Sequence, residues 1–287
     1  MMESKLSLEN VSKHFGSVKA LDDVSIDFKP GIYGLIGPNG AGKSTMIRLI
    51  ATLDFQTSGS IFYEDTPILS LKGAYRELIG LMPQDQKGYD HYSGYAFLQY
   101  MALLKGLGRK DAKVRIDALV KQVSLEESIH RKVGTYSGGM RQRLMFAQAL
   151  LGNPKIVILD EPTAGLDPFE RIRLRNYIRE IAKDRIVIIA THVMQDIESI
   201  ADVVILINHG KIVFQGASDD LLSTINHKVF EVDVDDSELE MYHAKYRVSS
   251  VYKYDKQYRV RYLDAHRLDG DVTPNFEDAY LYYMVEK

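Results

Sequence analysis

The sequence predicts an α/β fold. A parallel sheet with helices on both faces is expected to join an N-terminal antiparallel β subdomain, an inserted helical subdomain and a small C-terminal α+β appendage. Three observations support this prediction. A glycine-rich loop separates a short apolar run, residues 32–36, from an apolar helical run that starts at Met46. Strand-like apolar runs alternate with helical segments between residues 156 and 207. Nine of the 18 tyrosines lie between Tyr242 and Tyr283, which marks a separate C-terminal unit.

Period-two alternation of apolar residues predicts the N-terminal antiparallel strands. It runs through residues 6–11 and again through residues 24–28, with Phe15 and Gly16 in the turn between them. Such alternation is typical of strands that bury one face, so we expect this subdomain to pack one side of its sheet against the core.

Short segments follow the helix that starts at Met46. We interpret Ser58-Gly59-Ser60 as a turn that leads into a short strand at residues 61–63. Another short apolar run, residues 79–82, ends at Pro83 and Gln84.

The character of the chain changes near residue 88, where helical spacings replace strand-like runs. Apolar residues three to four positions apart predict helices at residues 95–107, 111–123 and 140–151. The sequence Gly152-Asn153-Pro154 then closes the last of them. We therefore predict an inserted helical subdomain over about residues 88–154.

The second half of the chain returns to alternating strands and helices. Strands are predicted at residues 156–159, 186–190 and 203–207, with an arginine-rich helix at 171–182. The tyrosine-rich tail predicts strands at residues 229–234 and 258–262 and a helix at 276–285. We divide the chain into a large domain, residues 1–222, and a C-terminal α+β extension, residues 223–287.

Composition excludes several classes of protein. The 287 residues carry a formal net charge of −3, so the overall charge gives no indication of nucleic-acid binding. The chain has no cysteine, which excludes disulfides and thiolate metal sites. The N-terminus lacks the apolar segment of a signal peptide, and no apolar run is long enough to span a bilayer. Any membrane-spanning part must therefore come from another chain.

The glycine-rich loop carries the strongest indication of chemistry. It reads Gly37-Pro38-Asn39-Gly40-Ala41-Gly42-Lys43-Ser44-Thr45 and matches the phosphate-loop pattern G-x-x-x-x-G-K-[ST] between a strand and a helix N-terminus. Glycines allow backbone N–H groups to surround a phosphate, and the helix N-terminus adds partial positive charge. Lys43 is expected to reach the β- and γ-phosphates, and the Ser44 hydroxyl to ligate Mg²⁺.

Two further motifs could act together with the phosphate loop, one at the end of a strand and one at the start of a helix. The strand at residues 156–159 ends in Asp160 and Glu161, at the carboxyl edge where parallel sheets place ligands. Asp160 can hold Mg²⁺, and Glu161 can accept a proton from an attacking water. Ser137-Gly138-Gly139 opens another helix, and it fits an ordinary helix cap as well as it fits an anion-binding segment.

In this order the three motifs resemble the ATP-binding cassette of ABC transporters, from about Ser4 to about Leu222. The resemblance implies a P-loop NTPase core that binds ATP and Mg²⁺. It implies that Glu161, His192 and Gln84 are catalytic and that Ser44, Gln84 and Asp160 hold the metal. It assigns nucleotide contacts to Phe15, Gly37, Asn39, Gly40, Ala41, Gly42, Lys43, Ser44, Thr45, Ser137, Gly138 and Gly139. Residues 164–167 resemble the loop that follows the catalytic strand. The sequence departs from the pattern at Tyr136 and Met140.

The resemblance also implies partners. Two ATP-binding subunits, identical or closely related, would enclose two ATP molecules, with the Ser137 segment of one chain completing the site of the other. Separate transmembrane subunits would dock near Asp85–Gln99, which places the chain peripherally on the cytoplasmic face of a membrane. The C-terminal tail, residues 274–281, is similar to extensions of bacterial exporter ATPases, which favours export. The alternative is a soluble ABC-type ATPase that acts on ribosomes or DNA.

Overall fold

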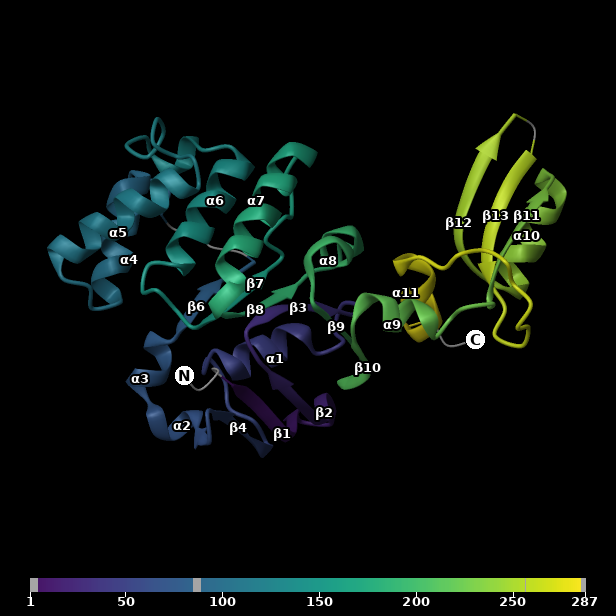
Figure 1. The fold of residues 1–287 in the computed structure, drawn as a ribbon, viewed down its shortest axis with the longest axis horizontal. Coiled ribbons are helices and arrows are strands. Elements are labelled where there is room, and N and C mark those ends of the chain that lie inside the picture. Colours follow the sequence, from purple (N-terminus) through teal and green to yellow (C-terminus); the bar gives the residue numbers. More distant parts are fainter. Residues whose placement is uncertain (1–4, 85–88, 256, 285–287) are drawn as a thin grey trace.

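The centre of the molecule is a six-stranded sheet in the order β10-β9-β3-β8-β7-β6 (Figure 1). The structure is a computed structural model that describes residues 5–84, 89–255 and 257–284. The central strands are β3 (Gly31–Ile36), β6 (Ile79–Met82), β7 (Ile156–Asp160), β8 (Ile186–Ala190), β9 (Val203–Asn208) and β10 (Lys211–Gly216). The five strands from β9 to β6 pair in parallel, and β10 pairs antiparallel with β9 at one edge. The predicted parallel core is confirmed.

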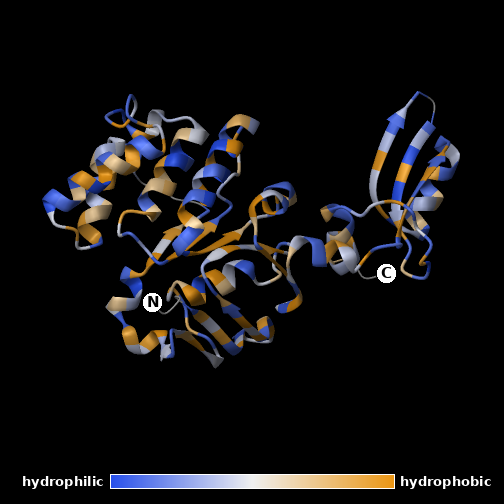
Figure 2. Ribbon diagram, in the orientation of Figure 1, coloured by the Kyte–Doolittle hydropathy of each residue, from blue (hydrophilic) through white to orange (hydrophobic). Residues whose placement is uncertain are grey.

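Both faces of the central sheet are buried, and this explains the near-continuous apolar runs of its strands (Figure 2). Val157, Leu159, Val187 and Ile189 point into one core, together with α6 (Gly138–Ala149), α7 (Pro168–Ile181) and α8 (Met194–Ile200). The intervening residues of the same strands point into a second core, which contains α1 (Lys43–Ile50). The sheet is therefore a layer between two helical or mixed layers.

The second core is closed by a four-stranded antiparallel sheet in the order β2-β1-β4-β5. Its strands are β1 (Leu6–Phe15), β2 (Val18–Phe28), β4 (Ser58–Tyr63) and β5 (Thr66–Pro67). The predicted antiparallel subdomain is confirmed, but its strands are longer than expected, and Phe15 ends β1 while Gly16 lies in the turn. The prediction of a turn at Ser58-Gly59-Ser60 was wrong, because these residues begin β4. The pairing of β1 with β4 is irregular between Glu9 and Ser12. There Gly59 takes a φ of +80° against the Asn10 carbonyl, so the glycine serves a bulge.

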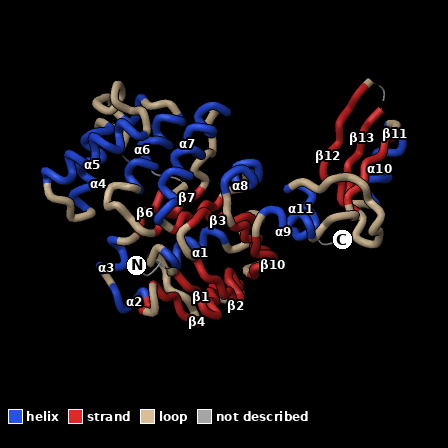
Figure 3. Tube along the Cα trace, in the orientation of Figure 1, coloured by secondary structure: helices blue, strands red, loops and turns tan. Residues whose placement is uncertain are grey.

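Helices dominate residues 94–149, as predicted (Figure 3). The subdomain contains α4 (Gly94–Leu104), α5 (Arg109–Gln122), a short 3₁₀ turn η1 (Val133–Thr135) and α6. Ser93 caps α4 through its side chain, which accepts a hydrogen bond from the Ala96 N–H. Two short helices that the sequence pattern did not predict, α2 (Ile68–Leu71) and α3 (Gly73–Glu77), precede β6. None of the helices in the described ranges is long and apolar enough to cross a membrane.

The C-terminal unit is an α+β arrangement, as predicted, and projects to one side of the large domain (Figure 1). Its sheet has the order β11-β13-β12, formed by β11 (Val229–Val234), β12 (Arg247–Tyr254) and β13 (Gln257–Leu263). The unit also contains α10 (Asp236–Lys245) and α11 (Phe276–Met284), and α9 (Ser218–Ser223) leads into it. Phe230, Val260 and Tyr262 form a small core of its own. Phe276 and Ala279 of α11 instead join the large core near α8, so α11 is the physical link between the two parts.

A buried ion pair fixes α11 to the C-terminal sheet. Asp278 of α11 is fully buried and accepts hydrogen bonds from Arg261 of β13, with the closest approach at 2.6 Å. Its carboxylate also accepts from the hydroxyl of Ser249 at 2.6 Å and from the backbone N–H of Asn275 at 2.9 Å. The Asn275 side-chain oxygen in turn accepts a hydrogen bond from the Asp278 backbone N–H at 3.0 Å. The two bonds form a reciprocal cap at the start of α11. Arg261 also pairs with Glu231 at 2.9 Å.

Replacing Asp278 by alanine is expected to reduce the free energy of unfolding by about 3–5 kcal/mol, because the substitution leaves a buried guanidinium without its main partner. Chemical denaturation followed by circular dichroism measures the change. Asp233→Ala is the matched control, because Asp233 forms an exposed pair with Arg259 in the same sheet at 2.8 Å, and exposed pairs contribute little. Equal effects of the two substitutions on the free energy of unfolding would contradict a large contribution of the buried pair to stability.

Candidate functional site

A cavity of about 260 Å³ at the carboxyl edge of the central sheet collects residues from four separate segments of the chain. It is lined by Asn39, Gly40, Gly42, Lys43, Ser44, Thr45, Gln84, Asp160, Glu161 and His192. Every one of these was a candidate from the sequence. The shared cavity results from the ends of β3, β6, β7 and β8 meeting at one edge.

The glycine-rich loop wraps the N-terminus of α1, as a phosphate-binding loop must. Gly42 immediately precedes the helix with a φ of +115°, a conformation that favours glycine. A Cβ on Gly42 would also stand 2.5 Å from the Ala20 carbonyl oxygen, so no larger residue fits. Gly37 and Ala41 are buried behind the loop and shape it without lining the cavity.

Lys43 folds back onto its own loop. Its Nζ donates to the carbonyl oxygens of Gly37 at 2.6 Å and Pro38 at 3.0 Å. Burial lowers the pKa of Lys43, and the charges of Glu161 and Asp160 act in the opposite direction. The ammonium group is therefore partly desolvated and held by two neutral carbonyl oxygens, and an anionic partner would compensate its burial better.

Glu161 is the most constrained acid of the site. Its backbone has a φ of +51°, which is unusual for a residue other than glycine. One carboxylate oxygen accepts from the His192 backbone N–H at 3.2 Å and lies 2.8 Å from His192 Nδ1. The other oxygen accepts from the Thr191 hydroxyl at 2.9 Å. Glu161 is thus held by the segment that follows β8, although its own strand is β7.

Thr191 is a positioning residue that sequence reasoning missed. Its hydroxyl oxygen accepts from the Val193 N–H at 3.0 Å, which leaves its hydrogen directed to Glu161. Thr191 is buried, with 1% exposure. No sequence signal beyond its place before His192 could have indicated this role, because the contact joins residues 30 positions apart.

A second missed network stabilises the loop that follows Glu161. The Thr163 hydroxyl donates to the Asp196 carboxylate at 2.5 Å, and both residues are buried. Asp196 also lies 3.6 Å from the guanidinium of Arg175 on α7. The network fixes α8 to α7 beside the end of β7, so the Glu161 backbone is supported from two sides.

The residues available for a divalent cation are oxygen donors. The Ser44 hydroxyl, the Asp160 carboxylate and the Gln84 amide oxygen border the same cavity. Burial raises the pKa of Asp160, with a smaller contribution from Glu161 in the same direction, and Lys43 opposes both. A nearby cation would relieve this cost of ionisation. This donor set suits Mg²⁺, which takes one or two protein oxygens plus phosphate and water.

The predicted contact residues of the Ser137 segment also do not line the cavity of their own chain. Ser137 and Gly138 are exposed and Gly139 is half-buried at the N-terminus of α6. The Ser137 hydroxyl oxygen accepts from the Met140 N–H at 3.2 Å, so the residue does cap its helix. Tyr136 is buried and donates its hydroxyl to the Ser128 carbonyl at 2.8 Å, which gives this departure from the family pattern a packing role.

Phe15 lies outside the phosphate cavity, at the end of β1. Its side chain is 51% exposed, so it does not belong to the hydrophobic core of the chain. Lys13 Nζ lies 4.8 Å from the centre of the ring. The ring is therefore available to a stacking partner on the side of the loop where β1 and β2 meet.

Gln84 stands between two cavities. The second, also of about 260 Å³, extends from Gln84 and Pro83 to Tyr89, Gly138 and Ala164. It connects the phosphate site to the helical subdomain and to the loop after Glu161. Residues 85–88 of the predicted docking segment Asp85–Gln99 lie outside the described residues.

Comparisons with known proteins agree with this geometry. A family described as ABC transporter matches residues 21–164. YdbJ of Bacillus subtilis, an uncharacterized ABC transporter ATP-binding protein, is 41% identical over 219 residues, 74% of this chain and 69% of that protein. The doxorubicin resistance ATP-binding protein DrrA of Mycobacterium tuberculosis is 36% identical over 208 residues, 72% of this chain and 63% of that protein. A structure of a bacterial Atm1-family ABC exporter with ATP bound is similar over 77% of this chain and 40% of that chain, with 25% identity and a TM-score of 0.68.

Thr191→Val is expected to lower kcat for ATP hydrolysis by about tenfold or more with little change in KM. The reason is that a hydrogen bond to a charged group contributes about 1.5–3 kcal/mol and this one orients Glu161. Steady-state kinetics at saturating MgATP measure the change. Thr191→Ser keeps the hydroxyl and should restore most of kcat. A valine variant with the rate of the unaltered protein would exclude the positioning role.

Proposed function

The chain belongs to the ATP-binding proteins of ABC transporters, and we propose that it hydrolyses ATP in the cavity beside Lys43 to drive separate membrane subunits. The observation that carries the proposal is the convergence of the phosphate loop, Asp160, Glu161, Gln84 and His192 on one cavity. The soluble alternative, an ATPase acting on ribosomes or DNA, gains no support from the relatives named above.

The first step is binding of the ATP phosphates by the loop. The backbone N–H groups at the N-terminus of α1 would surround the β-phosphate. Lys43 would exchange the carbonyls of Gly37 and Pro38 for the β- and γ-phosphate oxygens, because a charged acceptor is stronger than a carbonyl. Mg²⁺, held by Ser44, Asp160 and Gln84, would neutralise charge that develops on the phosphates.

The chemical step requires a base near the γ-phosphate. Glu161 would accept a proton from the attacking water. Its two hydrogen-bonded neighbours, Thr191 and His192, fix the direction of the carboxylate. The His192 side chain lines the cavity and is 70% exposed, which suits contact with the γ-phosphate.

The position of Ser137 supports a dimer that encloses the nucleotides. Because the Ser137 segment does not line its own cavity, it is free to complete the site of a second chain. The Ser137 hydroxyl oxygen is used by the Met140 N–H, so its hydrogen remains available for a phosphate oxygen. A second ATP-binding subunit, identical or closely related, is the partner we propose.

We propose that the membrane subunits contact the chain at the second cavity, which extends from Gln84 to Tyr89 and Ala164. A cluster of Tyr89, Tyr92, Phe97 and Tyr100 lies beside it, with Tyr89 and Phe97 centroids 4.8 Å apart. Tyr92 and Tyr100 remain exposed, and such aromatic side chains are common at interfaces. This contact would hold the chain at the cytoplasmic face of the membrane. The direction we propose is export, supported by the tail and by the name of the drug-resistance relative.

Glu161→Gln is expected to lower the ATPase rate by about 10²–10⁴-fold, because it removes the general base and preserves the side-chain shape. ATP binding should persist, since Lys43, Ser44 and Asp160 are unchanged. With ATP and Mg²⁺ the variant should elute as a dimer in size-exclusion chromatography, and the unaltered protein with ADP mainly as a monomer.

Glu198→Gln, an exposed acid on α8, is the control and should retain the rate of the unaltered protein. Full activity of Glu161→Gln would move the base to another residue. An inactive but monomeric variant would contradict the dimer.

Ser137→Arg is expected to abolish turnover while ATP still binds to the monomer, because the added bulk and charge would enter the site of the partner. A mixture of Ser137→Arg with Lys43→Ala chains contains dimers with one fully intact site. Such a mixture should form ATP-dependent dimers, whereas neither variant alone should do so. Ser223→Arg, at an exposed serine far from the site, should have no effect. Normal hydrolysis by Ser137→Arg would reduce this residue to a helix cap.

A further inference from the structure

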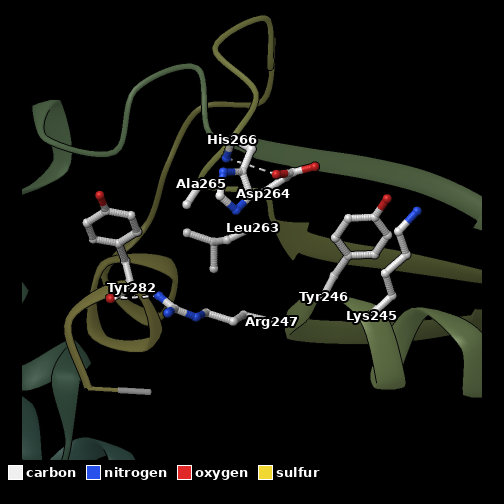
Figure 4. A pocket seen from close by; sticks show the side chains of 8 residues that line it. All are labelled: Lys245, Tyr246, Arg247, Leu263, Asp264, Ala265, His266 and Tyr282. Atoms are coloured by element: carbon white, nitrogen blue, oxygen red, sulfur yellow. Dashed lines mark hydrogen bonds between the residues drawn. The ribbon is translucent and has the colours of Figure 1, made fainter. Parts of the chain in front are cut away.

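The C-terminal unit contains a cavity of about 290 Å³ that the proposed ATPase mechanism does not use (Figure 4). It lies where the end of α10, the start of β12, the end of β13 and α11 meet. We propose that it binds a small organic anion with a flat apolar body, such as an aromatic carboxylate, sulfonate or phosphate. The proposal is independent of the nucleotide site.

The charges around the cavity favour an anion. The positively charged Lys245 and Arg247 line it together with His266, and Asp264 is its single carboxylate. Within the described residues, none of the three basic side chains forms an ion pair. The other arginines of the unit do, because Arg259 and Arg261 pair with strand or helix acids and Arg267 pairs with Asp269.

Arg247 is the side chain best placed to hold an acidic group. Its Nη1 donates to the Tyr282 carbonyl at 2.9 Å, which fixes the guanidinium at the edge of the cavity. Figure 4 shows this side chain passing below Leu263 toward Tyr282, with His266 on the opposite side. Guanidinium N–H groups remain for an acidic group of a ligand, with the geometry that suits paired oxygens. The Asp264 carboxylate accepts a hydrogen bond from the backbone N–H of His266 at 3.0 Å.

The apolar part of the proposed ligand has a matching surface. The buried Leu263 lies at the centre of the cavity, and Tyr246 and Tyr282 stand on opposite sides of it (Figure 4). Both rings are held by other contacts. Tyr246 packs 4.5 Å from the Tyr262 ring, and the Tyr282 hydroxyl accepts from Lys228 at 2.9 Å. The cavity therefore exists before binding, which lowers the cost of ordering its walls.

The position of the cavity gives a bound ligand access to both parts of the molecule. Tyr282 belongs to α11, which packs against α8 in the large core, whereas Arg247 and Leu263 belong to the C-terminal sheet. A ligand that contacts both would stabilise the junction between α11 and that sheet.

Fluorescence titration with 8-anilinonaphthalene-1-sulfonate tests the proposal, using the full chain with saturating MgADP to occupy the nucleotide site. The expected result is saturable binding that Arg247→Gln weakens by about tenfold or more, since a charge-assisted contact is lost. Lys245→Gln should weaken it in the same direction. N-phenyl-1-naphthylamine has the same aromatic system without the sulfonate and should bind at least about tenfold more weakly.

Lys253→Gln is the matched control, because Lys253 is an exposed lysine of the same unit that lies 5.2 Å from the Tyr258 ring, outside the cavity. It should leave the affinity within about twofold. Because Arg247→Gln also loses the bond to Tyr282, Arg247→Lys separates charge from folding and should retain most of the binding. Equal affinity for the neutral dye, equal effects of Lys245→Gln and Lys253→Gln, or no saturable binding while MgADP occupies the nucleotide site would overturn the proposal.

Discussion

The register of the parallel strands is the constraint on which the site depends. Leu35 of β3 and Asp160 of β7 both pair with Ala190 of β8. Three strands therefore end at the same level, and the segments that follow them emerge side by side. The phosphate loop follows β3, Glu161 follows β7, and Thr191 with His192 follows β8. A shift of one residue in this ladder would turn each of these side chains away from the cavity.

The electrostatics of the cavity follow from this convergence. Lys43, Asp160 and Glu161 are brought together with little solvent, so burial disfavours the charged forms of both Lys43 and Asp160. Their opposite charges offset part of that cost. A nucleotide with its metal ion would supply the remaining compensation, because it brings anionic oxygens to Lys43 and a cation to Asp160. The site is thus built for a ligand that carries both charges.

The C-terminal unit is connected to the large domain by apolar packing of α11 and by a buried ion pair. The core of the C-terminal unit is small, and the apolar side of α11 packs in the large core instead. The polar side of α11 is fixed by Asp278, whose buried carboxylate joins Arg261, Ser249 and the helix cap. A buried pair of this kind costs desolvation, but it specifies where the helix lies on the sheet. The cavity lined by Arg247, Leu263 and Tyr282 lies at this junction between α11 and the C-terminal sheet.

The sequence by itself determined the local elements and the chemistry of the motifs. The glycine spacing, the strand before it and the helix after it determined a phosphate loop, because only such a backbone leaves its N–H groups free at a helix start. Buried parallel strands, the helical insertion and the tyrosine-rich unit also follow from periodicity and composition. The bulge at Gly59 escaped prediction, since Ser-Gly-Ser indicates a turn unless the partner strand is known.

Only the tertiary structure decided which side chains meet. The bond from Thr191 to Glu161, the network of Thr163 with Asp196 and the pairing of Arg261 with Asp278 join residues that are 17 to 33 positions apart. No local pattern encodes such contacts, because they arise from strand order and register. The same holds for Ser137, whose distance from its own phosphate cavity becomes evident only when the helical subdomain is folded.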